Sequence, residues 1–254
     1  MQLAEYFRPG ALTRALHSYG VIAQERSWSV GHKLDLYLLC RRAFSDAGDE
    51  AELLSAFSHV HASLAKYWQV FRPRGPGSPG SPQALFAILR ASAPTFGMRS
   101  GTRLRTLRPE QRVEVWSFFL ALREIKANKG FPTMAASKFA HFFNPDLFPI
   151  YDTEVVWNQV FARFQPEFDA FCRDQGHAGN VEGAQWLANY VSWAAHLIQG
   201  LDASARDEFA DWMKGQAPGH AALDNGSSIA HELDACLFEF AAIGAAAIEA
   251  RLAR

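Results

Sequence analysis

The chain has 254 residues, enough for one large domain or two small ones. Hydrophobic residues make up 49% of it and aromatic residues 13%, a composition that supports a sizeable core and excludes intrinsic disorder. No apolar run approaches the roughly 18–20 residues needed to cross a bilayer. The opening residues, MQLAEYFRPG, lack the charged start and apolar stretch of a secretory signal. We therefore expect a cytoplasmic protein that does not enter the membrane.

The net charge of −1 hides an uneven distribution of charge along the chain. Residues 99–138 carry nine basic side chains against three acidic ones. A basic zone on a nearly neutral protein can attract a polyanion to one face. A second interpretation stays open, in which these charges only keep a surface solvated, because charge runs usually do that.

The spacing of apolar residues is helical almost throughout, with no alternation typical of strands. In chain order, helices are predicted at residues 11–25, 31–44, 49–71, 83–92, 109–127, 134–143, 153–164, 166–175, 181–199, 203–214 and 228–252. The predicted fold class is therefore all-α and globular. The helix at 109–127 is apolar nearly all round, so we expect it to be the buried central helix.

The clearest interruption is RPRGPGSPGSP, residues 72–82, with four prolines and three glycines. This composition predicts an exposed linker between an N-terminal helical region, residues 1–71, and a helical domain, residues 83–254. A loop within one compact unit is an equally good interpretation. Residues 94–108 are predicted to form an irregular basic loop.

Two capped helices are predicted around a proline-rich loop. Thr133 is placed to cap the helix at 134–143, which Asn144 and the following proline end. Residues 144–151, NPDLFPIY, form the loop. Asp152 is then placed to cap the next helix.

Neither the cysteines nor the histidines predict a metal site. Cys40, Cys172 and Cys236 lie far apart, without the spacing of a zinc site and too few for a four-cysteine iron–sulfur cluster. We expect them to be buried reduced thiols. His59 and His61 should face opposite sides of a helix and could not share a metal. The sequence also lacks phosphate-loop, dinucleotide-binding and metalloprotease motifs, so no cofactor is predicted.

Residues 130–157, GFPTMAASKFAHFFNPDLFPIYDTEVVW, resemble a segment of the helix-hairpin-helix DNA glycosylase superfamily, nearest to the branch that removes 8-oxoguanine. In that family a hairpin grips the DNA backbone, a lysine lies on its second helix, and an aspartate follows after a loop. S-K-F-A matches the lysine turn, and F-P-I-Y-D-T-E-V-V-W matches the aspartate turn. The resemblance implies an enzyme that flips a modified base out of double-stranded DNA and removes it, in repair or in phage defence.

The resemblance assigns the catalytic roles to Asp152 and Lys138. A carboxylate stabilises the cationic sugar of the transition state or activates water. A lysine is a nucleophile only where burial or a nearby cation lowers its pKa, and the apolar neighbours of Lys138 predict partial burial. The Lys138–Asp152 spacing is one helical turn shorter than the family's, so lysine attack and attack by water both stay open. So do simpler roles, a helix cap for Asp152 and a surface position for Lys138.

The remaining site residues are predicted around this segment. The predicted DNA-binding residues are Lys126, Lys129, Gly130, Thr133, Ser137, Arg103, Arg105 and Arg108. The predicted base pocket consists of Phe139, His141, Tyr151 and Trp157. Ordinary core packing is the alternative for each of these aromatic residues.

Three functions are therefore compared. The first is a monomeric DNA glycosylase. The second is a non-catalytic helical module that binds nucleic acid or a partner, and the third is a helical protein that binds another protein while its basic zone is incidental. Formation of abasic sites in DNA separates the first from the second, and the third predicts no salt-dependent DNA binding.

Overall fold

The computed structural model describes residues 30–44, 48–67, 80–97, 99–122, 132–151, 162–177 and 183–200. In these residues the chain forms seven α-helices, one short 3-10 helix and no strand, so the all-α prediction is confirmed there. None of the described helices is long and apolar enough to cross a membrane. The helices predicted at 11–25, 203–214 and 228–252 lie outside the described residues.

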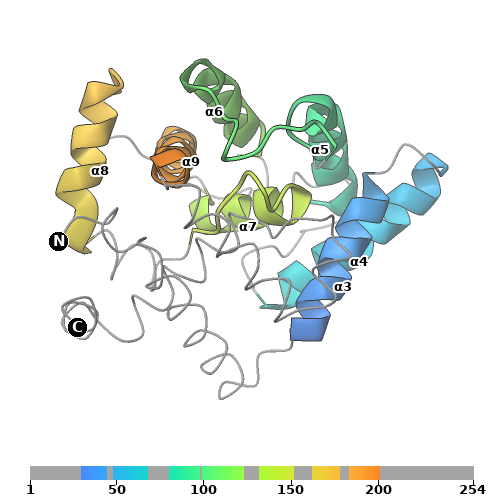
Figure 1. The fold of residues 1–254 in the computed structure, drawn as a ribbon. Coiled ribbons are helices and arrows are strands. Elements are labelled where there is room, and N and C mark those ends of the chain that lie inside the picture. The colour runs from blue at the N-terminus through green and yellow to red at the C-terminus, as the bar shows by residue number, and fades with distance from the viewer. Residues whose placement is uncertain are drawn as a thin grey trace.

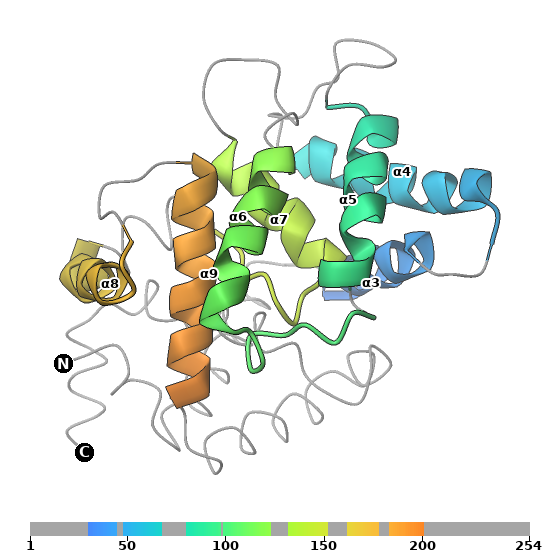
Figure 2. The same ribbon diagram turned by 90° about the horizontal axis from the view of Figure 1, so that it is seen from above.

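The helices pack around one of their number, α7. In chain order they are α3 (Val30–Ala43), α4 (Glu50–Tyr67), α5 (Pro82–Phe96), the 3-10 helix η2 (Pro109–Gln111), α6 (Arg112–Ala121), α7 (Thr133–Phe143), α8 (Ala162–Asp174) and α9 (Gly183–Gly200). On one side α7 contacts α3, with α4 and α5 beyond it (Figure 1). On the other side it contacts α9, which also packs against α6 and α8 (Figure 2).

A continuous cluster of buried apolar side chains joins all seven α-helices. Its rings meet across the chain: Phe44 lies edge-on to Phe143 at 4.8 Å between centroids, and Phe118 stacks on Phe148 at 4.9 Å. Aromatic pairs at such separations add stabilisation beyond the area that they bury. Helices before and after residues 72–82 therefore share one core.

The prediction that 109–127 is the buried central helix is wrong. Within α6 only one face is buried, while Val113 is 57% exposed and Leu120 37% exposed. The central helices are α7, with nine of its eleven residues buried, and α9, with twelve of eighteen. The reason is tertiary: α7 has partners on opposite sides, whereas α6 lies against α9 with one face open to solvent.

Helix α4 begins and packs as its sequence predicts. The Asp49 carboxylate accepts the backbone N–H of Glu52 at 2.9 Å, as a helix cap should. His59 is exposed and His61 buried, which confirms that they face opposite sides. The His61 ring contacts the Gly80 carbonyl at 2.8 Å through Nε2, and burial lowers the pKa of His61.

The end of the predicted linker is not exposed. Gly80 and Ser81 are both buried, and the Ser81 hydroxyl accepts the N–H of Ala84 to cap α5. The prediction is therefore wrong for these two residues, because His61 and the start of α5 enclose them. Residues 72–79 lie outside the described residues.

Helix α5 continues past its predicted end at residue 92 and includes Pro94. A proline removes one helical hydrogen bond, and because Pro94 lies in the last turn of α5, this loss falls at the end of the helix and not in its middle. Phe96 is buried against Phe118 and Phe148, which holds this turn in place. Gly97 then ends the helix, and a side chain there would meet the Ala93 carbonyl oxygen at 2.7 Å.

The start of α7 and the course of α8 also differ from prediction. Pro132 occupies the cap position of α7 and makes no side-chain hydrogen bond, because a proline side chain has no polar atom. Its carbonyl accepts the N–H of Ala136, and Thr133 is the first helical residue. Helix α8 is described from Ala162 and runs through Pro166, where a break between two helices was predicted. Local proline signals are overridden here by packing of α8 against α9.

Asn144, which ends α7 as predicted, is fully buried and joins three segments. Its side-chain Nδ2 donates to the carbonyls of Phe96 at 2.9 Å and Thr102 at 3.1 Å. Its Oδ1 accepts the N–H of Asp146 at 3.2 Å. One amide thus satisfies backbone groups of α5, of the following loop and of the turn after α7.

The substitution Asn144→Ala should lower the free energy of unfolding by about 2–4 kcal/mol, because it leaves several buried carbonyl and N–H groups without a hydrogen-bond partner. Urea denaturation measures this loss. The control is Ser117→Ala on the exposed face of α6, where a loss within about 0.5 kcal/mol is expected. A loss below about 1 kcal/mol in Asn144→Ala would contradict the role assigned to this amide.

Candidate functional site

A stripe of three polar side chains runs along α7 at spacings of four and three residues. Ser137, His141 and Asn144 therefore share one helical face. The chain after α7, residues 145–151, turns back along this face, and we call it the return segment. All three side chains are buried, so each must find a hydrogen-bond partner.

The partners are backbone groups of the return segment. His141 Nδ1 donates to the Phe148 carbonyl at 2.7 Å. The Ser137 hydroxyl accepts the N–H of Tyr151 at 3.0 Å and donates to the Met134 carbonyl at 2.8 Å. The return segment thus runs antiparallel to α7, and one hydrogen-bonded side chain on each successive turn of the helix, from Asn144 back to Ser137, holds it there.

Lys138 follows Ser137 and is only 4% exposed. The predicted burial of this lysine is confirmed, and its placement on the surface is excluded. Asp152 lies outside the described residues, but it follows Tyr151 in the sequence. The two residues that precede Lys138 and Asp152 are therefore hydrogen-bonded to each other.

The predicted base-pocket residues do not meet in one open pocket among the described residues. Phe139 is fully buried between Phe57 and His61, at 6.2 and 5.8 Å between ring centroids. His141 is fully buried under the return segment. Core packing accounts for both. Tyr151 keeps a partly exposed surface and lies edge-on to Trp186.

Trp157, Lys126, Lys129 and Gly130, which were predicted for the base pocket and the DNA interface, lie outside the described residues.

The predicted DNA-binding residues divide into exposed and engaged ones. Arg105 and Arg108 are exposed. Arg103 forms an ion pair with Asp146 at 2.8 Å, with both side chains 30% exposed. Ser137 is buried in its contact with the return segment, which occupies its hydroxyl.

Thr133, also predicted to bind DNA, is half-buried at the first position of α7.

The basic loop, residues 99–108 in the described part of the chain, is fixed on both sides. The Leu104 N–H donates to the carbonyl of Asp146 in the return segment at 2.9 Å. From α9, the Gln199 amide donates to the carbonyls of Leu104 at 2.8 Å and Leu107 at 2.9 Å. Both leucine side chains are buried. The loop therefore presents its exposed arginines from an anchored backbone.

The described cysteines are free and buried, as expected. Burial, together with the Asp169 charge, raises the pKa of Cys172 to about 11, and burial also raises the pKa of Cys40. Both thiols are therefore protonated and unreactive at neutral pH. Cys236 lies outside the described residues. In the described part of the chain no group of three His, Cys, Asp or Glu residues could hold a metal ion.

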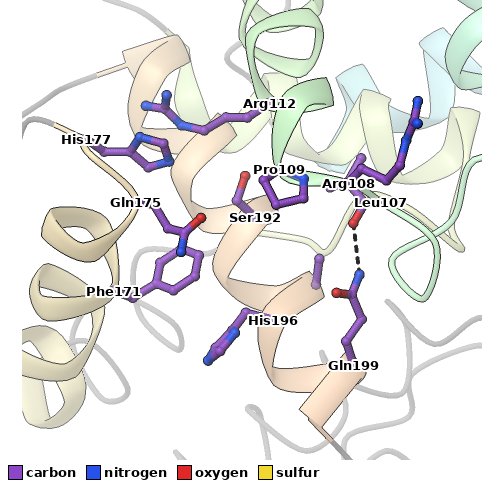
Figure 3. Close-up of a pocket in the computed structure, with 11 residues that line it drawn as sticks. Leu107, Arg108, Pro109, Arg112, Phe171, Gln175, His177, Ser192, His196 and Gln199 are labelled. Carbon is purple, nitrogen blue, oxygen red and sulfur yellow. Dashed lines mark hydrogen bonds between the residues drawn. The ribbon is translucent and has the colours of Figure 1, made fainter.

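A cavity that was not predicted from the sequence lies between the basic loop, α8 and α9 (Figure 3). It measures about 60 Å³. Its polar lining includes Arg108, Arg112, Gln175, His177, Ser192 and His196. No spacing in the sequence signals this site, because its lining residues come from three separate segments.

Arg112 and His177 lie at the same end of this cavity (Figure 3). Burial lowers the pKa of His177 first, and the positive charge of Arg112 lowers it further. Burial also lowers the pKa of Arg112. The arginine still carries its charge at neutral pH, since guanidinium groups do so throughout proteins.

Removing the Arg112 charge should therefore raise the pKa of His177. In Arg112→Gln the imidazolium no longer faces a cation, so the protonated form persists to higher pH. An NMR pH titration of the His177 ring measures the shift. The control is Arg90→Gln on α5, which removes an exposed arginine that does not line the cavity. An unchanged or lowered pKa in Arg112→Gln would refute the coupling of these two side chains.

Comparison with known proteins identifies no relative for this chain: no protein-family model, no curated protein and no solved structure matches it.

Proposed function

We propose that this chain is a DNA glycosylase-like enzyme that flips a modified base out of DNA and hydrolyses its N-glycosidic bond, with Lys138 and Asp152 at its reactive centre. The observation that carries the proposal is the buried Lys138 beside the hydrogen bond between Ser137 and Tyr151. This bond joins Ser137, which precedes Lys138, to Tyr151, which precedes Asp152. What supports the proposal is therefore a fixed contact between Ser137 and Tyr151, the residues that precede Lys138 and Asp152 in the sequence.

The chemistry gives each residue a distinct task. Cleavage of the bond to the base builds positive charge on the sugar, which a fixed carboxylate stabilises. Asp152 has this role, and it also takes the proton of an attacking water if water is the nucleophile. A lysine amine attacks the sugar only in its neutral form, which burial favours. The 4% exposure of Lys138 supports that route and leaves both nucleophiles to be tested.

The anchored basic loop supports DNA as the substrate. Arg105 and Arg108 are exposed on a loop whose backbone is bonded to the return segment at Asp146. Cations held there would contact phosphates close to the proposed reactive centre and fix the register of the duplex. The remaining predicted DNA contacts at residues 126–130 belong to the same proposal.

A non-catalytic nucleic-acid-binding module is the second candidate. It is favoured by the burial of Phe139 and His141, which leaves Tyr151 as the one described base-pocket candidate with exposed surface. Such a module would bind DNA without forming abasic sites. We place it second because it assigns no role to Lys138 beside the Ser137–Tyr151 hydrogen bond.

The decisive prediction concerns Asp152→Asn. The wild-type protein should form abasic sites in DNA carrying modified bases, and the variant should form them at least about a hundredfold more slowly, because asparagine lacks the negative charge. Alkaline cleavage of the abasic sites measures the rate. The matched control is Asp49→Asn, which changes a helix-capping aspartate on α4 and should leave the rate unaltered. Equal rates in Asp152→Asn and wild type would remove Asp152 from catalysis.

Lys138→Met separates the two nucleophiles while keeping an unbranched side chain of similar length in the buried position. If Lys138 attacks the sugar, borohydride traps a covalent complex with wild-type protein, and the variant traps none. If the variant still releases the base, water is the nucleophile. No abasic sites with any modified DNA, together with salt-dependent binding, would favour the second candidate over the enzyme.

DNA binding should depend on the exposed arginines of the basic loop and not on Arg103. The double change Arg105→Ala and Arg108→Ala should flatten the slope of log K against log salt by about one for each phosphate that the variant no longer neutralises. Arg103→Ala should leave the slope unchanged, because this side chain is paired with Asp146. Fluorescence anisotropy over a salt series measures both. An unaltered slope in the folded double variant would exclude this loop from the DNA interface.

A further inference from the structure

The cavity between the basic loop, α8 and α9 has the size and lining of a small-anion site (Figure 3). Its volume of about 60 Å³ holds several water-sized groups, since one water needs about 10–15 Å³ by this measure. Donors and cations line it, including Arg108, Arg112 and His177, and no carboxylate does so among the described residues. Leu107 and Phe171 contribute apolar surface to its lining. The lining therefore suits a negatively charged occupant.

The buried polar groups beside the cavity lack an acceptor. Arg112 Nε donates to the Asn189 Oδ1 at 2.8 Å, but Arg112 Nη2 and Asn189 Nδ2 are buried donors without a partner. Within the described part of the chain, no carboxylate forms an ion pair with Arg112. A buried donor without an acceptor costs about 1–3 kcal/mol, and an unpaired buried charge costs more. Of these two residues only Arg112 lines the cavity, and an oxyanion bound there would supply the opposite charge to its guanidinium.

Asn189 explains why the guanidinium of Arg112 keeps an unpaired donor. It is fully buried in the middle of α9, where its neighbours are apolar, and it gives the guanidinium a single oxygen. A carboxylate at the same position would offer two acceptors and a full negative charge. The amide leaves the arginine charge available to a ligand while still fixing the direction of the side chain.

We propose that this cavity binds a phosphate-sized oxyanion, with Arg112 as its counter-charge and His177 as a second hydrogen-bond donor. Gln175 lies between Phe171 and His177 and offers a further donor, whereas the Arg108 side chain points away from Arg112 and His177 at the other end of the cavity (Figure 3). The phosphate group comes either from the DNA backbone or from a free phosphate or phosphate monoester. Arg108 connects the two possibilities, because it lines the cavity and belongs to the basic loop. The site does not depend on base excision.

Inorganic phosphate is the probe. In phosphate-free buffer, added phosphate should raise the melting temperature of the wild-type protein and broaden the phosphorus NMR signal in a saturable way, whereas chloride at equal ionic strength should not. Arg112→Gln should weaken phosphate binding at least about tenfold, the scale of a charged hydrogen bond. Arg90→Gln, which removes one exposed positive charge elsewhere, should bind phosphate as the wild type does.

Equal phosphate binding by folded Arg112→Gln and wild type would overturn the proposal, and so would an equal effect of chloride. Where Arg112→Gln does not fold, His177→Gln takes its place, because His177 is only half-buried and lies beyond the end of α8. It should bind phosphate several-fold more weakly, and wild-type affinity in this variant overturns the proposal.

A second measurement assigns the source of the phosphate group. If the cavity holds a backbone phosphate, inorganic phosphate competes with duplex DNA at constant ionic strength, and Arg112→Gln weakens DNA binding. If it holds a free phosphate, DNA binding is unchanged in both tests while phosphate still binds. A failure of base excision leaves phosphate binding intact, so the two proposals fail separately.

Discussion

The structure depends on the need to satisfy backbone polar groups inside a core of aromatic rings. A segment that turns back through such a core brings N–H and C=O groups that water cannot reach. Ser137, His141 and Asn144 supply the missing donors and acceptors from one face of α7. Without them the return segment would leave buried groups unpaired, at a cost comparable to a large part of the stability of a domain.

The same three side chains also position the residues of the proposed reactive centre. They hold the return segment against α7. As a result Tyr151, the residue before Asp152, is hydrogen-bonded to Ser137, the residue before the buried Lys138. Burial of a lysine is uncommon in proteins, and this is why the proposed function centres on Lys138.

Positive charge is divided between structural and available groups. Arg103 is paired with Asp146 and helps to join the basic loop to the return segment. Arg105 and Arg108 extend from that loop into solvent. Arg112 lies beside Asn189 with one nitrogen buried and unpaired. Within residues 103–112 one arginine therefore forms an ion pair, two are exposed to solvent, and one is partly buried.

Helix positions in this chain were largely predictable from the sequence. Helices at 31–44, 134–143 and 181–199 agree with α3, α7 and α9 to within two residues, because apolar periodicity reflects a face that must be buried. The burial of Lys138 followed from its apolar neighbours, and the end of α7 followed from Asn144. These properties depend on residues that are close together in the sequence.

Only the tertiary structure decided which helix is central and what the polar residues of the core contact. The partners of Asn144 lie 42 and 48 residues away, and Arg112 reaches an asparagine 77 residues along the chain. The burial of Phe96 keeps Pro94 inside a helix that its own sequence would have ended. The cavity likewise combines three segments. Periodicity specifies which side of a helix is apolar, but the partner on that side, and the hydrogen bonds it demands, arise only when distant segments pack together.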